Sequence, residues 1–308
     1  MKKRTALWLV PLVLLVLSAA GWAWRGNSFA RGGAKVPSAS GAPALAGTPA
    51  AASSLTVSHV QGHVERRDGD AGAWQPLAAD TQVTERDSVR TTGDASATLV
   101  AGDGLSVVVA EQSQIELVAV SRDETKLVIE RGRLSANVQG GKVALRVGVL
   151  GSDAVVDTDS AAFAVLRGDH GQVAVAVTDG DVDVSAQRVR VRVAAGEQSL
   201  VVGDRAPAPP ARIPPSLFLK VARSGPRLVN QRSTGLGGTT NPGAVVFING
   251  VAIPTDADGH FNARVELQEG KNELRVEAID ALGRAERLDL SAVTVDTQPP
   301  KLEGKTVW

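Results

Sequence analysis

Residues 172–193 read QVAVAVTDGDVDVSAQRVRVRV, and this stretch decides the fold class. Valine occupies every second position from 173 to 177, and again from 189 to 193. A period of two residues is typical of a β-strand, because successive side chains point to opposite faces of a sheet. Asp179-Gly180 lies between the two runs, and such a pair easily adopts the positive φ that a tight hairpin turn requires. The stretch therefore predicts antiparallel strands joined by hairpins.

Short valine-rich runs continue over residues 55–202, without helical periodicity longer than a turn or two. Asp103-Gly104 and Gly140-Gly141 separate such runs, and we expect a hairpin at each. A unit made of an apolar run, a glycine and a second apolar run recurs, which indicates a weak internal repeat. The glycines of this unit are Gly62, Gly132 and Gly180. We predict one all-β domain over residues 55–202.

The composition excludes several classes of function. Among the 308 residues, 43% are hydrophobic but only 3% are aromatic, and there is no cysteine. Disulfides, cysteine-based metal sites and a thiol nucleophile are therefore excluded. Lys plus Arg and Asp plus Glu number 33 each, so no net charge of the whole chain attracts it to nucleic acid. These features are typical of a bacterial envelope protein that relies on its hydrophobic core.

The N-terminus carries an export signal. Basic residues at 2–4 precede an uncharged stretch, residues 6–24, whose length lies between that of a cleaved signal peptide and that of a membrane-spanning helix. We expect residues 1–25 to form an apolar helix that anchors the chain in the inner membrane, with a cytoplasmic N-terminus and periplasmic domains. The alternative is a cleaved signal peptide and a secreted or periplasmic protein. Residues 26–54, rich in Gly, Ala, Ser and Pro, are predicted to be a disordered linker.

Residues 55–202 contain many short motifs in a characteristic order and spacing. They are the run 57–64 with Gly62, WQPL at 74–77, DSVRT at 87–91, SATL at 96–99, DG at 103–104, SQIEL at 113–117, the runs 127–138 and 173–184, and AGEQ at 195–198. In this combination they resemble the periplasmic domain of the FecR family. The family implies a signal relay in which a cytoplasmic helical domain binds a sigma factor and the β domain contacts an outer-membrane receptor. Because only five residues precede the apolar stretch, we expect no direct sigma-factor regulation by this chain.

A second β domain is expected at residues 216–296, after a proline-rich linker at 203–215. Its motifs are NPG at 241–243, VVFING at 245–250, DGHF at 258–261, VEL at 265–267 and GKN at 270–272. Together they resemble bacterial immunoglobulin-like modules. Asn249-Gly250 and Asp258-Gly259 are predicted to be hairpin turns of a small β-sandwich. Residues 297–308 are assigned to a C-terminal tail.

Candidate site residues are few. Asp256 and Asp258 are weak candidates for metal ligands, because a hairpin turn explains them better than a calcium loop. His59 and His63 would share one face of a strand about 13 Å apart, too far to bind one metal ion. Trp74 is expected in the core.

A row of arginines, Arg188, Arg190 and Arg192, would line one face of a strand and could contact an anionic glycan or the carboxylates of a partner. A solvated face with salt bridges is the alternative interpretation of this row.

No catalytic residues and no cofactor are predicted, so we expect no enzyme activity. The predicted function is that of a non-catalytic envelope protein that binds an envelope partner protein through its β domains, in signalling or scaffolding. Its other predicted partner is the membrane, through the N-terminal helix, and no nucleic acid is expected. The alternative is a structural, cell-wall-associated protein that binds peptidoglycan or anionic glycan.

Overall fold

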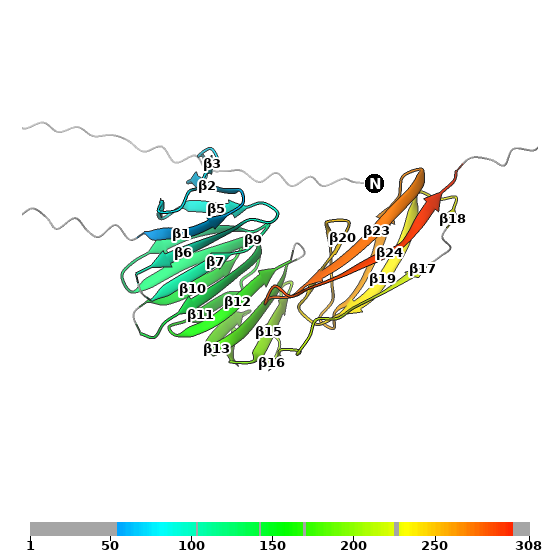
Figure 1. The fold of residues 1–308 in the computed structure, drawn as a ribbon. Coiled ribbons are helices and arrows are strands. Elements are labelled where there is room, and N and C mark those ends of the chain that lie inside the picture. Colours follow the sequence, from blue (N-terminus) through cyan, green and yellow to red (C-terminus); the bar gives the residue numbers. More distant parts are fainter. Residues whose placement is uncertain (1–53, 103, 142, 169–170, 225–227, 298–308) are drawn as a thin grey trace, which may run out of the picture. The chain divides into compact units, whose positions relative to one another are not determined.

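The computed structural model describes residues 54–297 except 103, 142, 169–170 and 225–227 (Figure 1). These residues fall within one compact unit, Pro49–Trp308. Every helix or strand assigned within the described part is a β-strand, so the predicted all-β class is confirmed. None of the described residues forms a helix that could cross a membrane. The predicted anchor at 1–25, nearly all of the linker at 26–54, and residues 298–308 of the tail lie outside the described residues.

The N-terminal β domain contains the strands β1 to β16, arranged in two hydrogen-bonded layers. The first layer contains β1 (Leu55–Gln61), β4 (Gln82–Val83), β6 (Ser96–Ala101), β7 (Leu105–Val109), β12 (Ala161–Arg167), β15 (Glu197–Val202) and β16 (Ala211–Arg212). The second layer contains β2 (Val64–Asp68), β3 (Gln75–Pro76), β5 (Asp87–Thr91), β8 (Gln114–Val120), β10 (Ala144–Val149), β11 (Val155–Thr158) and β14 (Val189–Ala194). Two long strands, β9 (Glu124–Val138) and β13 (Gln172–Ala186), take part in both layers and join them.

The alternating valines and leucines of both layers point into a shared core. Leu99 and Leu134 of the first layer and Ile115 and Val184 of the second belong to one cluster of buried side chains. Full burial of each such side chain contributes about 1.5–3 kcal/mol relative to an exposed one. The period of two residues in the sequence therefore arises because one face of each strand is buried in this core.

Glycines mark the corners where a strand passes from one layer to the other. Gly132 in β9 and Gly180 in β13 have φ values of +82° and +69°. A Cβ atom at Gly132 would lie 2.7 Å from the Cα of Ser113, and one at Gly180 would lie 2.4 Å from the carbonyl oxygen of Ser160. Only glycine fits both the backbone angle and the close approach. Gly62, between β1 and β2, has the same corner role, so the repeat seen in the sequence corresponds to three similar corners.

Two of the predicted hairpins are wrong for this reason. Asp179-Gly180 lies within β13 at a corner, and Gly140-Gly141 leads from β9 to β10, which pairs with β9 in parallel. Gly104 does join an antiparallel pair, β6 and β7. In this fold, a turn dipeptide can lie where a strand passes from one layer to the other without reversing its direction. The local sequence of such a corner does not differ from that of a hairpin turn.

The C-terminal β domain is made of two sheets. One contains β17 (Leu219–Ser224), β19 (Ser233–Thr240) and β22 (His260–Glu266). The other contains β18 (Leu228–Val229), β20 (Val245–Ile248), β21 (Val251–Ile253), β23 (Gly270–Ile279) and β24 (Ala285–Val295). Leu236 of the first sheet and Val276 of the second belong to one buried cluster. The predicted hairpin at Asn249-Gly250 joins β20 and β21, with φ values of +49° and +81°.

The two β domains share a small third apolar cluster. Ala174, Ala176 and Leu200 of the N-terminal domain lie in it together with Val245 and Ala281 of the C-terminal domain. A buried hydrogen bond adds to it, in which the hydroxyl of Thr255 donates to Oε1 of Gln172 over 2.6 Å. The first part of β13 is consequently buried on both faces.

Part of the proline-rich segment 203–215 lies along the first layer. Ala211 and Arg212 pair with β15 as β16. The N–H of Ala208 donates to the carbonyl of Leu200, and that of Ile213 donates to the carbonyl of Gly196. Since these backbone groups are bound along the sheet, the segment continues the first layer.

Candidate functional site

The predicted arginine row is only partly present. Arg190 and Arg192 lie on β14 as exposed side chains, and both approach Asp183 of β13, at 3.8 Å and 3.3 Å. Arg188 lies outside the strand, in the turn before it, with a φ of +62°. The expected row of three on one strand face is therefore wrong. The two strand arginines fit the alternative of a solvated face with salt bridges.

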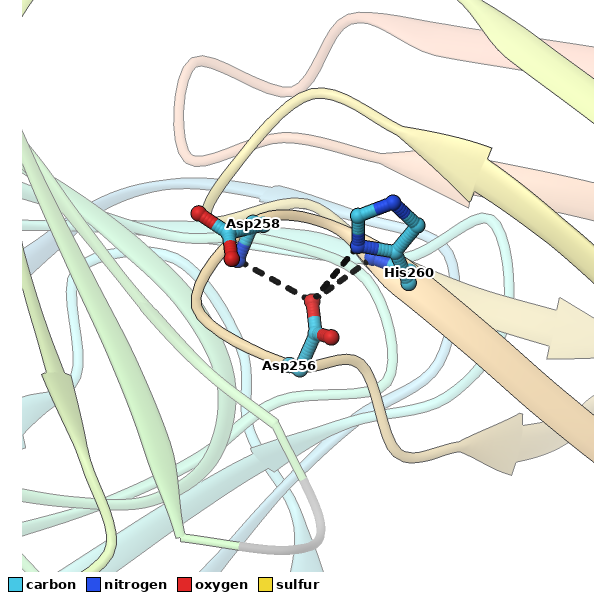
Figure 2. Close-up of side chains that lie close together, drawn as sticks. All are labelled: Asp256, Asp258 and His260. Carbon is cyan, nitrogen blue, oxygen red and sulfur yellow. Dashed lines mark hydrogen bonds and ion pairs between the residues drawn. The ribbon is translucent and has the colours of Figure 1, made fainter.

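Asp256 and Asp258, in the turn before β22, lie close to His260, the first residue of that strand, as Figure 2 shows. One carboxylate oxygen of Asp256 accepts hydrogen bonds from the backbone N–H groups of Asp258 and His260, at 3.0 and 2.8 Å. The same oxygen lies 3.4 Å from Nδ1 of His260. The hydrogen bond from the His260 backbone is the main reason why the pKa of Asp256 lies below its ordinary value. All three side chains are exposed, and the geometry is that of a tight turn in which Asp256 binds the backbone.

The histidines do not form a pair. Gly62 separates His59, on β1, from His63, which precedes β2. The prediction that His59 and His63 share a strand face is therefore wrong, because a corner lies between them. His63 lies 3.6 Å from the carboxylate of Glu65. His170 lies outside the described residues.

Trp74 is half-buried and contacts arginines, so the prediction that it lies in the core is wrong. Its ring lies 4.9 Å from the guanidinium of Arg67 and 4.1 Å from that of Arg90. Arg90 also donates to the carboxylate of Glu65 over 2.6 Å. This hydrogen bond is the main reason why the pKa of Glu65 lies below its ordinary value, with the charge of Arg90 adding to it.

Among the described residues, a groove of about 640 Å³ lies beside the corner at Gly132. Its floor is formed by the connections between the two layers at 91–94, from β5 to β6, and at 110–112, from β7 to β8, together with the corner 131–133 of β9 and the end of β12, residues 166–168. These segments stack on each other through backbone hydrogen bonds, for example from Gln112 to Thr92 and from Ala110 to Arg133. The backbone groups are thus bound within the protein, and side chains are left to contact a ligand.

The wall of the groove that comes from the C-terminal β domain combines apolar side chains with one ion pair. Val245, Phe247, Ala252 and Ile279 line it together with Glu277 and Arg287. Phe247 packs against the apolar cluster that the two domains share. The wall is therefore supported from behind by buried side chains.

Five arginines and four acidic residues line the groove, the acidic ones being Glu65, Asp94, Glu111 and Glu277. Two of the arginines have carboxylate partners, Arg90 with Glu65 at 2.6 Å and Arg287 with Glu277 at 2.7 Å. Three others, Arg131, Arg133 and Arg167, also line the groove, and no carboxylate among the described residues lies within 4.0 Å of their nitrogens. The groove therefore offers positive charge that is not neutralised by direct ion pairs.

Arg133 is half-buried. Its Nη1 donates to the hydroxyl of Ser135 over 3.3 Å, and its Cζ would lie only 2.7 Å from a Cβ atom at Gly283. Burial lowers the pKa of Arg133, while the charges of Glu111 and Asp280 act in the opposite direction. Arg167 donates through Nε to the carbonyl of Leu150 over 3.0 Å, which fixes its position at the end of β12.

The sequence prediction missed this groove. A local signal was available, because Arg131 and Arg133 flank Gly132, the glycine of the repeated unit. A corner places both neighbours of its glycine near the edge of the two layers. The apolar wall could not be foreseen, since it comes from residues more than a hundred positions later in the chain.

Comparisons with known proteins give a limited result. No family model matches the chain, and no curated protein matches it. Two crystal structures of a candidate anti-sigma factor from Parabacteroides distasonis are similar over 41% of this chain and 59% of theirs. Their identities are 19% and 18%, and the TM-score is 0.35 for both. A polysaccharide lyase is similar over 80% of this chain and 40% of its own, at 7% identity and a TM-score of 0.21. Similarity at this level carries no argument about activity.

Proposed function

We propose that this chain is a non-catalytic cell-envelope protein that presents its two β domains to a protein partner, in signalling or scaffolding. The export signal at residues 1–25 supports the location, with an inner-membrane anchor and periplasmic domains. The motifs that resemble the FecR family and the immunoglobulin-like modules support a role in recognition.

The observation that carries the proposal is the arginine-lined groove beside the corner at Gly132. Its residues suit binding better than catalysis. Glu65 and Glu277, the two groove carboxylates with direct arginine partners, are held by those arginines and are poorly placed to accept a proton from a substrate. Unpaired arginines beside an apolar wall are frequent at sites of protein recognition.

Photo-crosslinking in intact envelopes tests the proposal. A photoreactive amino acid replaces Gln112, an exposed residue that lines the groove, in the full chain. The matched control carries the same amino acid at Val118, which is 43% exposed and lies outside the groove. We expect one crosslinked protein at position 112 that is absent at position 118.

The alternative function, binding of peptidoglycan or anionic glycan, predicts a different outcome. The full chain would then sediment with purified cell walls in a salt-sensitive manner, and position 112 would capture no protein. That combination would exclude the proposed function in favour of the alternative.

A further inference from the structure

The groove has a charge pattern that selects for a particular ligand. Arg131, Arg133 and Arg167 come from two neighbouring strands, β9 and β12, where Gly132 pairs directly with Arg167. The three arginines therefore lie close together along the backbone of these two strands. Guanidinium groups pair carboxylates in a planar, two-pronged geometry, and such charge-assisted hydrogen bonds are stronger than neutral ones.

We propose that the groove binds an extended, acidic segment of the partner protein, whose carboxylates pair with Arg131, Arg133 and Arg167. This inference deepens the proposed function and rests on it. It names the chemistry of the segment, namely carboxylate side chains alternating with apolar ones.

The apolar wall favours a peptide over a polysaccharide. Phe247 and Ile279 line the same groove as the three arginines. An extended peptide points alternate side chains in opposite directions, so it can present carboxylates to one wall and apolar side chains to the other. A uronic-acid polymer would satisfy the arginines but would leave this wall facing hydroxyl groups.

The size of the groove is suited to a short segment. Its volume of about 640 Å³ lies within the range of roughly 300–1,000 Å³ that ligand pockets occupy in general. A folded domain could not enter it. The occupant is therefore a strand-like segment or a chain end of the partner.

Fluorescence anisotropy with a defined probe tests the inference. The probe is a fluorescein-labelled peptide of alternating glutamate and leucine, and the protein is the full chain in detergent solution. A peptide of alternating lysine and leucine and soluble peptidoglycan fragments are the comparison ligands. We expect only the acidic peptide to bind, with an affinity that falls as the salt concentration rises.

Two double variants separate the groove from general charge effects. Arg131→Gln with Arg167→Gln should weaken binding of the acidic peptide by at least about tenfold, because two charge-assisted contacts are removed. Arg190→Gln with Arg192→Gln removes the same charge from exposed positions on β14 and should leave binding unchanged. Thermal unfolding verifies that each variant is folded.

The inference is overturned if the groove variant binds the acidic peptide as tightly as the unmodified chain, or if the β14 variant loses as much affinity. It is also overturned if the peptidoglycan fragments bind and the peptide does not. Should the acidic peptide fail to bind while position 112 still captures a protein in envelopes, the groove chemistry is wrong but the proposed function stands.

Discussion

At the scale of single residues, the contacts around Arg90 show how a surface ion pair is organised. The guanidinium of Arg90 lies over the ring of Trp74 and donates to Glu65, so one side chain connects an aromatic ring to a carboxylate. Trp74 supplies a flat surface that holds the guanidinium in place. The position of Arg90 at the groove therefore depends on a neighbour that sequence reasoning had assigned to the core.

Replacing Arg90 is predicted to change the titration of Glu65. The carboxyl pKa of Glu65 is lowered, so its contribution to stability is present above the ordinary range of glutamate and is lost as the pH falls through the lowered pKa. Arg90→Gln should raise the pKa of Glu65 towards its ordinary value, as measured by NMR titration of the side-chain carboxyl. Arg67→Gln, which removes the other contact of Trp74, is the control and should leave the pKa of Glu65 in place. An unchanged pKa in Arg90→Gln would refute this explanation.

A second prediction concerns the stability cost of replacing glycines that have a positive φ. Gly132 and Gly196 have the same φ of +82°, but a Cβ atom at Gly196 would meet no atom within 4 Å. Gly196→Ala should therefore cost only the backbone strain of about 1–2 kcal/mol. Gly132→Ala should cost about 2–5 kcal/mol, because a clash with Ser113 is added. Urea unfolding of the full chain measures both, and equal costs would contradict the role assigned to the corner.

A third prediction concerns Asp87, which is fully buried. Its Oδ1 lies 3.0 Å from Nε of Arg66, and its Oδ2 accepts hydrogen bonds from the N–H and the hydroxyl of Thr84 at 2.6 and 3.0 Å. Asp87→Ala should destabilise the N-terminal domain by about 3–5 kcal/mol, because it leaves a partly buried arginine without its partner. Asp70→Ala, at an exposed position, should stay within about 0.5 kcal/mol of the unmodified chain. A loss below about 1 kcal/mol in Asp87→Ala would contradict the structural role of this carboxylate.

At the scale of elements, β13 is the strand that connects the parts. Val173, Val175 and Val177 point into the core, while Ala174 and Ala176 on the opposite face meet the C-terminal domain. Its second part crosses Gly180 and enters the other layer. One strand therefore joins two layers and a second domain.

A charge on the outer face of β13 should loosen the contact between the domains without unfolding the core of the N-terminal domain. Ala176→Asp would place an unpaired carboxylate in an apolar cluster, which is costly. We expect faster proteolysis within the segment 203–215, whose backbone is bound along β15. Ala162→Asp is the control, because Ala162 lies on β12, which is paired with β13, at a half-buried position outside the cluster. Equal cleavage rates in the two variants would contradict the assigned contact.

The strands could be predicted from the sequence, but the way in which they are arranged into two layers could not. Alternating valines predicted β-structure because burial of one face imposes the period of two. Whether Gly180 reverses a strand or turns a corner depends on distant contacts with Ser160, which no local pattern contains. The alternation of valine and alanine in 173–177 makes both faces of the strand apolar. It could therefore have predicted that other residues cover the second face.

At the scale of the whole molecule, the groove is the feature that single elements do not explain. The corners of the N-terminal domain supply its arginines, and the C-terminal domain supplies its apolar wall. The predicted site on β14 used only the local alternation of arginine and valine. The groove required the stacking of segments that are up to forty residues apart in sequence.

The most direct test of the central claim is photo-crosslinking at position 112 in intact cells, compared between the unmodified chain and the Arg131→Gln/Arg167→Gln variant. Both chains should be present at equal levels, as verified by immunoblotting. The account predicts that the crosslinked partner is captured by the unmodified chain and is lost or reduced at least about tenfold in the variant. Capture of the same partner at an undiminished level by the variant would contradict it.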